Sequence, residues 1–424
     1  MTPQKPSPAS VFWPRCSAVK ECTGRAVEPS GGCPAHLRPR EFERFVGSLR
    51  PGAEVDLRGV TIPSWLLEAV LDAVTGPDGR PHLGRTRFDG AVLPSDAALR
   101  AFCVEQDSSF DGACFLGAAS FYDARFFGNA SFRDVRFGRN VSFHGARFHR
   151  HTSFEEAVFA EDALFGDANW HADASFRRAA FMGAACFDGA RFGRDAAMQA
   201  ARFGGAASFK RVQVTRHARF ERTRFRHGMW LGPLVAGGRI ELVDTTVHGG
   251  LRVRAAARKV TARGATVHGE ADFRLRHAEL DLSDALFEGT VSVRSLHHPI
   301  QGLTEPPWAG PAEVRLTSLR GADAELLQVT DVDLSECGFP GLRRPEVLRI
   351  TGERPPAGVR GGPGPRRGAG RAVRVAAWIA VIAALLFCGA SFLRYDHRQD
   401  VRQHDRHGDR SDNTQTAHTA GPNT

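Results

Sequence analysis

The stretch ASFRDVRFGRNVSFHGARF, residues 130–148, has a phenylalanine at alternating steps of five and six residues. Extended in both directions, this pattern gives two interleaved series between Phe88 and Leu231. Each series advances by eleven residues, and all 27 of its combined positions are apolar. Twenty of the chain's 30 phenylalanines belong to the two series. Such a strict period indicates a repeat architecture, in which each unit buries its apolar face against the next unit.

The position two residues before each large apolar residue is mostly alanine, as with Ala130 before Phe132 and Ala146 before Phe148. In an extended segment, residues two apart point to the same face, so the large and the small residue both face inward. A strict step of five and six leaves no common face on a helix of 3.6 residues per turn, which excludes an α-helix. The pattern therefore predicts a parallel β-helix whose coils stack about 4.8 Å apart.

These phenylalanine-anchored pentads with alanine two places earlier resemble the pentapeptide-repeat protein family, in the variant whose pentads alternate with hexads. The resemblance implies an all-β fold, a right-handed quadrilateral parallel β-helix. It is specific for the fold and nearly silent on function.

A weaker repeat continues the solenoid after Leu231. The segments 246–254, 266–274 and 286–294 are similar in sequence and lie twenty residues apart. A period of 20 to 22 residues is then one full coil, so that eleven residues make half a coil. His248 and His268 would stack on adjacent coils, but Glu288 takes the third place, which favours solvated histidines over a metal pair.

Outward arginines are expected to stack on two opposite faces, Arg125 on Arg147 and Arg202 on Arg224. These columns suit either an anion-binding stripe or a solvated surface, and the interspersed acids favour the solvated surface.

A serine column accompanies the first phenylalanine series. Its hydroxyls are expected to bond to the backbone of turns. The column consists of Ser109, Ser120, Ser131, Ser142, Ser153, Ser175 and Ser208.

Four potential metal ligands precede the repeats: Cys16, Cys22, Cys33 and His36, with the spacing C-x5-C-x10-C-x2-H. Three thiolates and one imidazole can complete a tetrahedral zinc site, and four protein ligands make such a site structural rather than catalytic. The alternative is that these are ordinary residues of a capping segment, because the spacing matches no standard zinc finger. A disulfide is disfavoured if the compartment is reducing.

Two amphipathic helices are predicted in front of the repeats, at 39–49 and from Ser64, as the N-cap, to about Val74. A helical cap would cover the unpaired strand edges and the open core of the first coil. The predicted domains run in chain order: a disordered segment 1–15, the Cys/His segment and cap 16–82, the strong β-helix 83–231, weaker coils 232–342 with a loop at 297–311, a Gly/Pro/Arg linker 343–371, a transmembrane helix 372–394 and a disordered tail 395–424.

The predicted membrane span is centred on residues 375–393, VAAWIAVIAALLFCGASFL, which contain no charged residue. Nineteen residues at about 1.5 Å each nearly match the roughly 30 Å hydrocarbon core of a bilayer. The first ten residues lack a hydrophobic signal core, so a single-pass protein with a cytoplasmic repeat domain is expected.

The expected function is that of a non-catalytic, membrane-anchored scaffold that binds another protein. The formal net charge is +9, and nearly all basic residues are arginines, a bias typical of a GC-rich bacterial genome. A DNA-mimic inhibitor of a type II topoisomerase, which the family resemblance raises, would need an acidic face. A β-helix enzyme acting on carbohydrate would need clustered carboxylates or a metal on one face. Nucleic acid is not the expected partner, and the sequence specifies neither the partner nor the oligomeric state.

Overall fold

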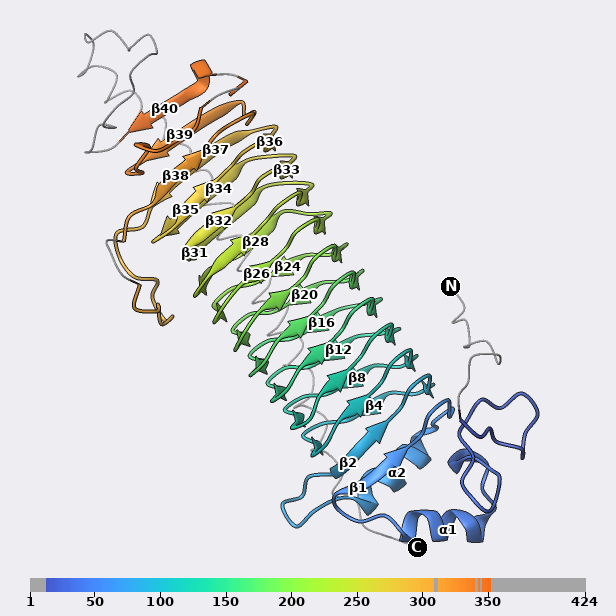
Figure 1. Cartoon of the computed structure of the whole chain (residues 1–424). Helices are drawn as coiled ribbons and strands as arrows, with labels where there is room; N and C mark the ends of the chain where they lie inside the picture. Colours follow the sequence, from blue (N-terminus) through green and yellow to red (C-terminus); the bar gives the residue numbers. More distant parts are fainter. Residues whose placement is uncertain (1–12, 309–311, 340–341, 344, 352–424) are drawn as a thin grey trace, which may run out of the picture. The chain divides into compact units, whose positions relative to one another are not determined.

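The computed structural model describes residues 13–308, 312–339, 342–343 and 345–351. These residues wind into a parallel β-solenoid, in which every strand pairs with strands one coil away (Figure 1). In the first coils strand n pairs with strand n+4, as β10 does with β6 and β14, so each coil has four short strands. This agrees with the predicted quadrilateral coil and the 22-residue period.

The four strands of a coil define four faces, which we name A to D. Face A begins with β2 (His82–Arg87) and continues through β6 (Ser108–Ser109), β10 (Ala130–Ser131), β14 (Thr152–Ser153), β18 (Ala174–Ser175), β22 (Ala196–Ala197), β26 (Ala218–Arg219), β29 (Arg239–Glu241), β32 (Lys259–Thr261), β35 (Glu279–Asp281) and β38 (Arg315–Ser318). Face B is the separate ten-stranded sheet: β3 (Val92–Leu93), β7 (Cys114–Phe115), β11 (Arg136–Phe137), β15 (Val158–Phe159), β19 (Ala180–Phe181), β23 (Arg202–Phe203), β27 (Arg224–Phe225), β30 (Thr246–Val247), β33 (Thr266–Val267) and β36 (Leu286–Phe287).

Faces C and D complete the coil. Face C contains β4 (Ala97–Ala98), β8 (Ala119–Ser120), β12 (Val141–Ser142), β16 (Ala163–Leu164), β20 (Ala185–Cys186), β24 (Ala207–Ser208), β28 (Met229–Ala236), β31 (Leu251–Ala256), β34 (Ala271–Arg276), β37 (Thr290–Ser295), β39 (Leu326–Thr330) and β40 (Leu348–Thr351). Face D contains β5 (Cys103–Val104), β9 (Arg125–Phe126), β13 (Arg147–Phe148), β17 (Asn169–Trp170), β21 (Arg191–Phe192) and β25 (Val212–Val214).

The core consists of stacked phenylalanine rings, as the two series predict. Phe110 stacks on Phe132 with ring centroids 4.8 Å apart and planes 2° apart, and Phe121 stacks on Phe143 at 4.6 Å and 3°. Neighbouring stacks meet edge to face, as Phe132 and Phe143 do at 5.5 Å and 85°. Both arrangements are favourable for aromatic quadrupoles. The intervening alanines are buried, so the predicted inward columns are confirmed.

Two kinds of corner explain the alternation of five and six residues. The five-residue step turns through two residues, the second of which has positive φ, such as Asp123 (52°), Asp134 (51°) or Gly145 (66°). The six-residue step has one more residue, and its coils approach closely: a Cβ on Gly128 would lie 2.3 Å from the carbonyl carbon of Gln106. A side chain at Gly128 would therefore require a shift of the backbone, whereas other six-residue corners accommodate Arg139, Arg150 or Glu161 at the equivalent position.

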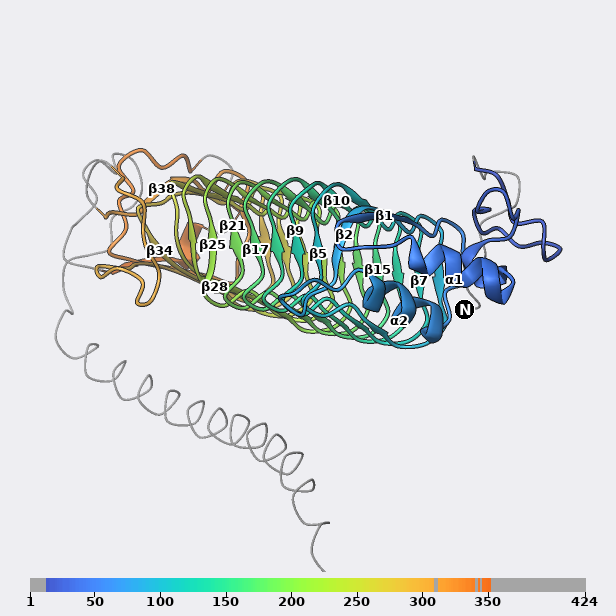
Figure 2. The ribbon, with the colours of Figure 1, turned by 90° about the horizontal axis from the view of Figure 1, so that it is seen from below.

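The first coil starts earlier than predicted, because β1 (Ala53–Asp56) already pairs in parallel with β2. Helix α1 spans Pro39–Gly47 and α2 spans Ser64–Ala73, at the N-terminal end of the stack (Figure 2). Pro63, rather than Ser64, is the N-cap residue of α2, and no side chain caps this end. Leu67 and Val70 of α2 are buried in the solenoid core, which is consistent with a capping role.

The last coils have three sides. From β28 onward, one long strand covers the places of two short ones, and strand n pairs with strand n+3, as β31 does with β28 and β34. Losing one corner shortens the coil to twenty residues, which accounts for the predicted pairing of Thr246, Thr266 and Leu286. Strand β40 extends the sheet to Thr351, beyond the expected end at residue 342.

The predicted loop at 297–311 packs against the solenoid over its described part, residues 297–308. Ile300, Leu303 and Trp308 lie on Val235 and Ala256, and Trp308 donates a hydrogen bond to the carbonyl of Gly237 at 3.2 Å. None of the helices within the described ranges is long and apolar enough to cross a membrane. The predicted span at 375–393, like the predicted tail, lies outside those ranges.

Candidate functional sites

The segment before α1 brings together the four predicted metal ligands. An antiparallel bridge between Arg15 and Arg25 closes a loop that contains Cys16 and Cys22. A short 3-10 turn, η2 (Pro34–His36), begins directly after Cys33, and the His36 N–H donates to the Cys33 carbonyl at 2.7 Å. This turn places Cys33 and His36 on the same side of the chain.

One ligand atom from each of these four residues lies within 4.8 Å of the other three. The Sγ atoms of Cys22 and Cys33 are 3.8 Å apart. Nδ1 of His36 lies 3.6 Å from Sγ of Cys16 and 3.3 Å from Sγ of Cys33. Cys16 and Cys33 are buried, whereas His36 is exposed.

The thiols of this cluster have very different acidities. Burial raises the pKa of Cys33, and the neighbouring Cys22 and Cys16 charges raise it further. Burial also raises the pKa of Cys22. Burial acts in the same direction on Cys16, but hydrogen bonds from the Cys33 backbone and from His36 outweigh it and lower the pKa of Cys16 to about 6. Three thiolates at this distance repel one another unless a cation lies between them.

The backbone at Gly24 lies close to two cysteines of the cluster. The Gly24 N–H points to Sγ of Cys22 at 3.4 Å, and a Cβ at Gly24 would lie 2.9 Å from Cβ of Cys33. The loop is fastened to the first coil through Thr23, whose hydroxyl donates to the Gly59 carbonyl at 2.9 Å, and through Arg25, which pairs with Asp56 at 3.2 Å. The cluster therefore lies where the N-terminal segment joins the solenoid.

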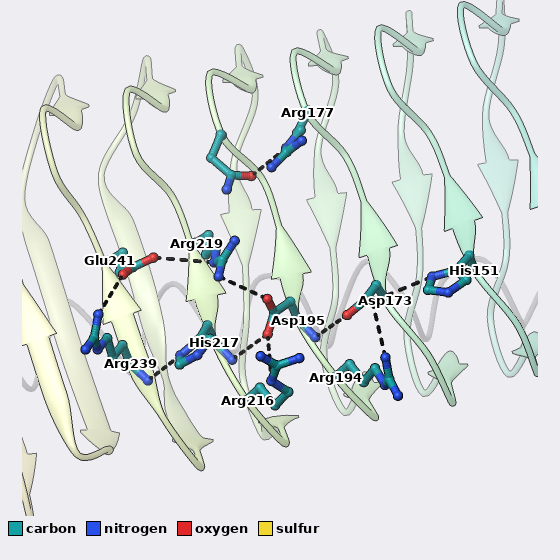
Figure 3. Close-up of polar contacts among 11 residues, drawn as sticks. His151, Asp173, Arg177, Arg194, Asp195, Arg216, His217, Arg219, Arg239 and Glu241 are labelled. Atoms are coloured by element: carbon teal, nitrogen blue, oxygen red, sulfur yellow. Dashed lines mark hydrogen bonds and ion pairs between the residues drawn. The ribbon is translucent and has the colours of Figure 1, made fainter.

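A second polar feature runs along the corner between faces D and A (Figure 3). Here a side chain on each coil accepts a hydrogen bond from the backbone of the next coil. Asp173 accepts from the Asp195 N–H at 3.1 Å, Asp195 from the His217 N–H at 3.2 Å, and Nδ1 of His217 from the Arg239 N–H at 3.1 Å. We call this series the corner ladder.

The carboxylates of the corner ladder are also paired with arginines. Asp173 lies 3.9 Å from Arg194, and Asp195 lies 3.7 Å from Arg216 and 3.2 Å from Arg219. A shallow groove of about 550 Å³ lies over these residues. Because each carboxylate already binds a backbone N–H and a guanidinium, the corner ladder is suited to fixing coil on coil rather than to acid–base catalysis.

The serine column agrees with the prediction only in part. Ser142 and Ser153 accept hydrogen bonds from the backbone N–H groups of His144 and Glu155 in the next turn, at 3.4 Å and 3.3 Å, as predicted. Other serines bind side chains. Ser109 donates to Asp89, Ser131 to Asp111 and Ser208 to Asp188, each at 2.5 Å. These acceptors are carboxylates in the previous coil, twenty residues earlier, at the corner that follows the paired strand. Carboxylate oxygens accept stronger hydrogen bonds than carbonyl oxygens do, which accounts for the difference.

A basic surface covers face C of the three-sided coils. We call it the arginine face; it consists of Trp230, Arg252, Arg254, Arg274 and Arg294. Arg254, Arg274 and Arg294 pair in register on β31, β34 and β37, so their exposed side chains project from three consecutive coils. The guanidinium of Arg252 lies 4.9 Å from the centre of the Trp230 ring, a cation–π distance.

The arginine face lines a groove of about 540 Å³ that also contains acids. Asp272 pairs with Arg274 at 2.8 Å, and Glu270 lines the same groove. The surrounding sequence is strongly basic: residues 191–263 contain sixteen Arg or Lys and four Asp or Glu, whereas residues 86–190 contain ten and fourteen. Residues 264–343, in contrast, contain six Arg or Lys and thirteen Asp or Glu, so positive charge is concentrated in the middle coils.

The sequence contained a signal for the arginine face, because the three copies twenty residues apart each end in an arginine. This signal is separate from the arginine columns next to phenylalanine, for which outward stacking was predicted. Those columns are placed as predicted: Arg125 pairs in register with Arg147 on face D, and Arg202 with Arg224 on face B. His248 stacks on His268 at 4.8 Å, and His268 binds Glu288 at 2.8 Å, as expected.

Comparison with known families gives one match. A family model described as pentapeptide repeats (9 copies) matches residues 105–147 and 135–180, which form part of the four-sided coils. Comparison with curated proteins and with solved structures found no match.

Proposed function

Because the chain is a pentapeptide-repeat protein whose described residues form a β-solenoid, we propose that it is a non-catalytic scaffold that binds an acidic protein partner on the arginine face. The observation that supports this most directly is the ladder of Arg254, Arg274 and Arg294 on three consecutive coils. Side chains on a stacked parallel sheet repeat at about 4.8 Å, and because the backbone beneath them is already ordered, binding costs side-chain entropy but little backbone entropy.

The chemistry of the groove favours a protein over a nucleic acid. Asp272 and Glu270 lie among the arginines, where they would repel a continuous phosphate backbone. A protein surface carries both signs of charge and can place basic groups opposite these two acids. Arginine and tryptophan are also the residues most often found at the energetic centre of protein interfaces.

The proposal that the scaffold is non-catalytic is supported by the hydrogen bonds and ion pairs that its carboxylates make. Those of the corner ladder bind backbone N–H groups and arginines, and those beside the serine column accept hydrogen bonds from serine hydroxyls. A carboxylate engaged in this way is poorly available as a general base or a nucleophile.

We further propose that the scaffold is held at a membrane by residues 375–393. Support comes from the sequence, because nineteen consecutive uncharged and mainly apolar residues are long enough to span a bilayer. Anchoring would raise the local concentration of the scaffold near partners at the same membrane.

The arginine face can be tested with a fluorescent oligo-glutamate peptide as the probe. Fluorescence anisotropy would measure its binding to the full-length protein at low salt. Changing Arg254, Arg274 and Arg294 together to Gln should weaken binding at least about tenfold, because three positive charges are removed from the groove. Binding by the native protein should also weaken as salt is raised.

The matched control changes Arg136, Arg202 and Arg224 to Gln, since these exposed arginines lie on face B. The control should retain the native affinity. Equal loss in both variants would show that only net charge matters and would contradict the proposal. Tighter binding of a single-stranded oligonucleotide of the same charge would instead favour a nucleic-acid partner.

A further inference from the structure

We propose that Cys16, Cys22, Cys33 and His36 bind one structural zinc ion, which fastens the N-terminal segment to the first coil of the solenoid. This inference is independent of the proposed scaffold function. It rests on the geometry of the four ligand atoms and on the small number of buried apolar side chains in the segment.

The distances match the edges of a tetrahedral zinc site. With Zn–S bonds of about 2.3 Å and a Zn–N bond of about 2.0 Å, two sulfur ligands lie about 3.8 Å apart and a sulfur and a nitrogen about 3.5 Å apart. The Cys22–Cys33 distance is 3.8 Å, and His36 lies 3.6 Å and 3.3 Å from Cys16 and Cys33. These three distances link all four ligand atoms, and one ion fits at the centre of the tetrahedron that the atoms define.

The ligand set selects the metal. Three thiolates and an imidazole are soft or borderline ligands, which suit Zn²⁺ and not Mg²⁺ or Ca²⁺. Four protein ligands leave no open coordination position, so this ion would have a structural role. The Gly24 N–H at 3.4 Å from Sγ of Cys22 would stabilise a thiolate there.

The segment lacks a core of its own. Within residues 13–38, the buried apolar side chains are those of Cys16, Ala26, Cys33 and Pro34. Two of these four are the proposed metal ligands. Segments too small to bury an adequate core generally depend on a metal or a disulfide for order.

A disulfide accounts for the cluster less well. A bond between Cys22 and Cys33 would require their sulfurs at about 2.05 Å, far closer than the 3.8 Å observed. It would also leave Cys16 and His36 without a role. The cysteines of the coils, Cys103, Cys114, Cys186 and Cys337, belong to no such group of ligands among the described residues.

The test is the metal content of the full-length protein, purified without a polyhistidine tag in reducing buffer free of chelators. Elemental analysis should find about one zinc per chain. Cys33→Ser should lose this zinc, and Cys103→Ser, which changes a buried cysteine of the solenoid, should retain it. Replacing the zinc with Co²⁺ should give the absorption spectrum of tetrahedral thiolate coordination.

A second pair of variants keeps the test valid if Cys33→Ser does not fold. His36 is exposed, so His36→Ala should fold but bind less than one zinc per chain, and His36→Cys should restore full occupancy. A chelator should increase hydrogen exchange in residues 13–38 while the coils from 105 to 180 stay protected. Protein without zinc, or equal zinc in the native and His36→Ala proteins, would overturn the proposal, as would a Cys22–Cys33 disulfide in peptide mapping.

Discussion

Trp170 takes the place of a phenylalanine in one inward stack, between Phe148 at 5.4 Å and Phe192 at 4.6 Å. Its ring packs as theirs do, but its buried Nε1–H has no hydrogen-bond partner among the described residues. A buried polar group without a partner costs about 1–3 kcal/mol. The fold therefore tolerates this cost at one position in an otherwise apolar core column.

We expect Trp170→Phe to raise the free energy of unfolding by about 1 kcal/mol, because it removes the unsatisfied N–H while keeping an aromatic ring in the stack. Denaturant unfolding followed by circular dichroism would measure the change. Phe148→Asp is the contrasting variant and should lose several kcal/mol, because it buries an unpaired charge in the same stack. Lower stability of Trp170→Phe than of the native protein would show that the indole is held by packing that a phenyl ring cannot replace.

Residue-scale prediction from the sequence succeeded for the inward positions, because an apolar column recurs every eleven residues. It was right for Ser142 and Ser153, which bind turn backbone, and it missed the serines that donate to carboxylates twenty residues earlier. Finding Asp111 as the partner of Ser131 requires the register of the coils and the direction of each corner, and these follow only from the folded chain. The Cys/His cluster could be predicted in part. Its ligands could be named from the sequence, but not the distances between them.

Among the elements, the loop at 297–308 differs most from its expected character. Arg276 lies 2.9 Å from Glu305, and each side chain is only 11% exposed. Arg276 also donates to the carbonyls of Leu296 and His297, at 3.2 Å and 2.7 Å. The proline-rich composition indicated a loop correctly. It gave no sign of this docking, which combines the contacts of Arg276 with the apolar packing of Ile300 and Trp308.

We expect Glu305→Ala to release this loop while leaving the coils folded. The change removes a charged hydrogen bond worth about 2 kcal/mol and leaves Arg276 half-satisfied in a nearly buried position. Hydrogen exchange measured by mass spectrometry should rise in residues 297–308 and stay unchanged in 105–180. His298→Ala, on the exposed side of the same loop, is the control and should change neither region. Unchanged protection in Glu305→Ala would mean that the apolar contacts of Trp308 suffice.

The change from four-sided to three-sided coils is a second feature at this scale. The sequence indicated it through the shorter period of twenty residues. The merging of two strands into one could not be predicted, because a corner disappears only when residues such as 251–256 alternate inward and outward without interruption. The same merging sets Arg252 and Arg254 side by side on one extended strand, and so it creates the arginine face.

At the scale of the whole solenoid, acidic and basic residues are distributed unevenly along the chain. Coils within residues 86–190 are slightly acidic, those within 191–263 are strongly basic, and those within 264–343 are again acidic. The overall value of +9 hides this separation, which is why charge alone did not predict a binding surface. A basic surface would also attract the negatively charged lipids of a membrane to which the protein was anchored.

The last prediction concerns that anchor. We expect the full-length protein, expressed in bacteria, to stay in the membrane fraction after alkaline carbonate extraction, and a variant lacking residues 372–394 to be released. We also expect the repeats to stay inside the cell, because moving a folded solenoid across a membrane is harder than moving the polar residues 395–424. Protease treatment of intact spheroplasts should then remove a tag placed after Thr424 and leave the repeats intact. Digested repeats with a protected tag would reverse this orientation. Equal extraction of both proteins would rule out a membrane span in residues 372–394.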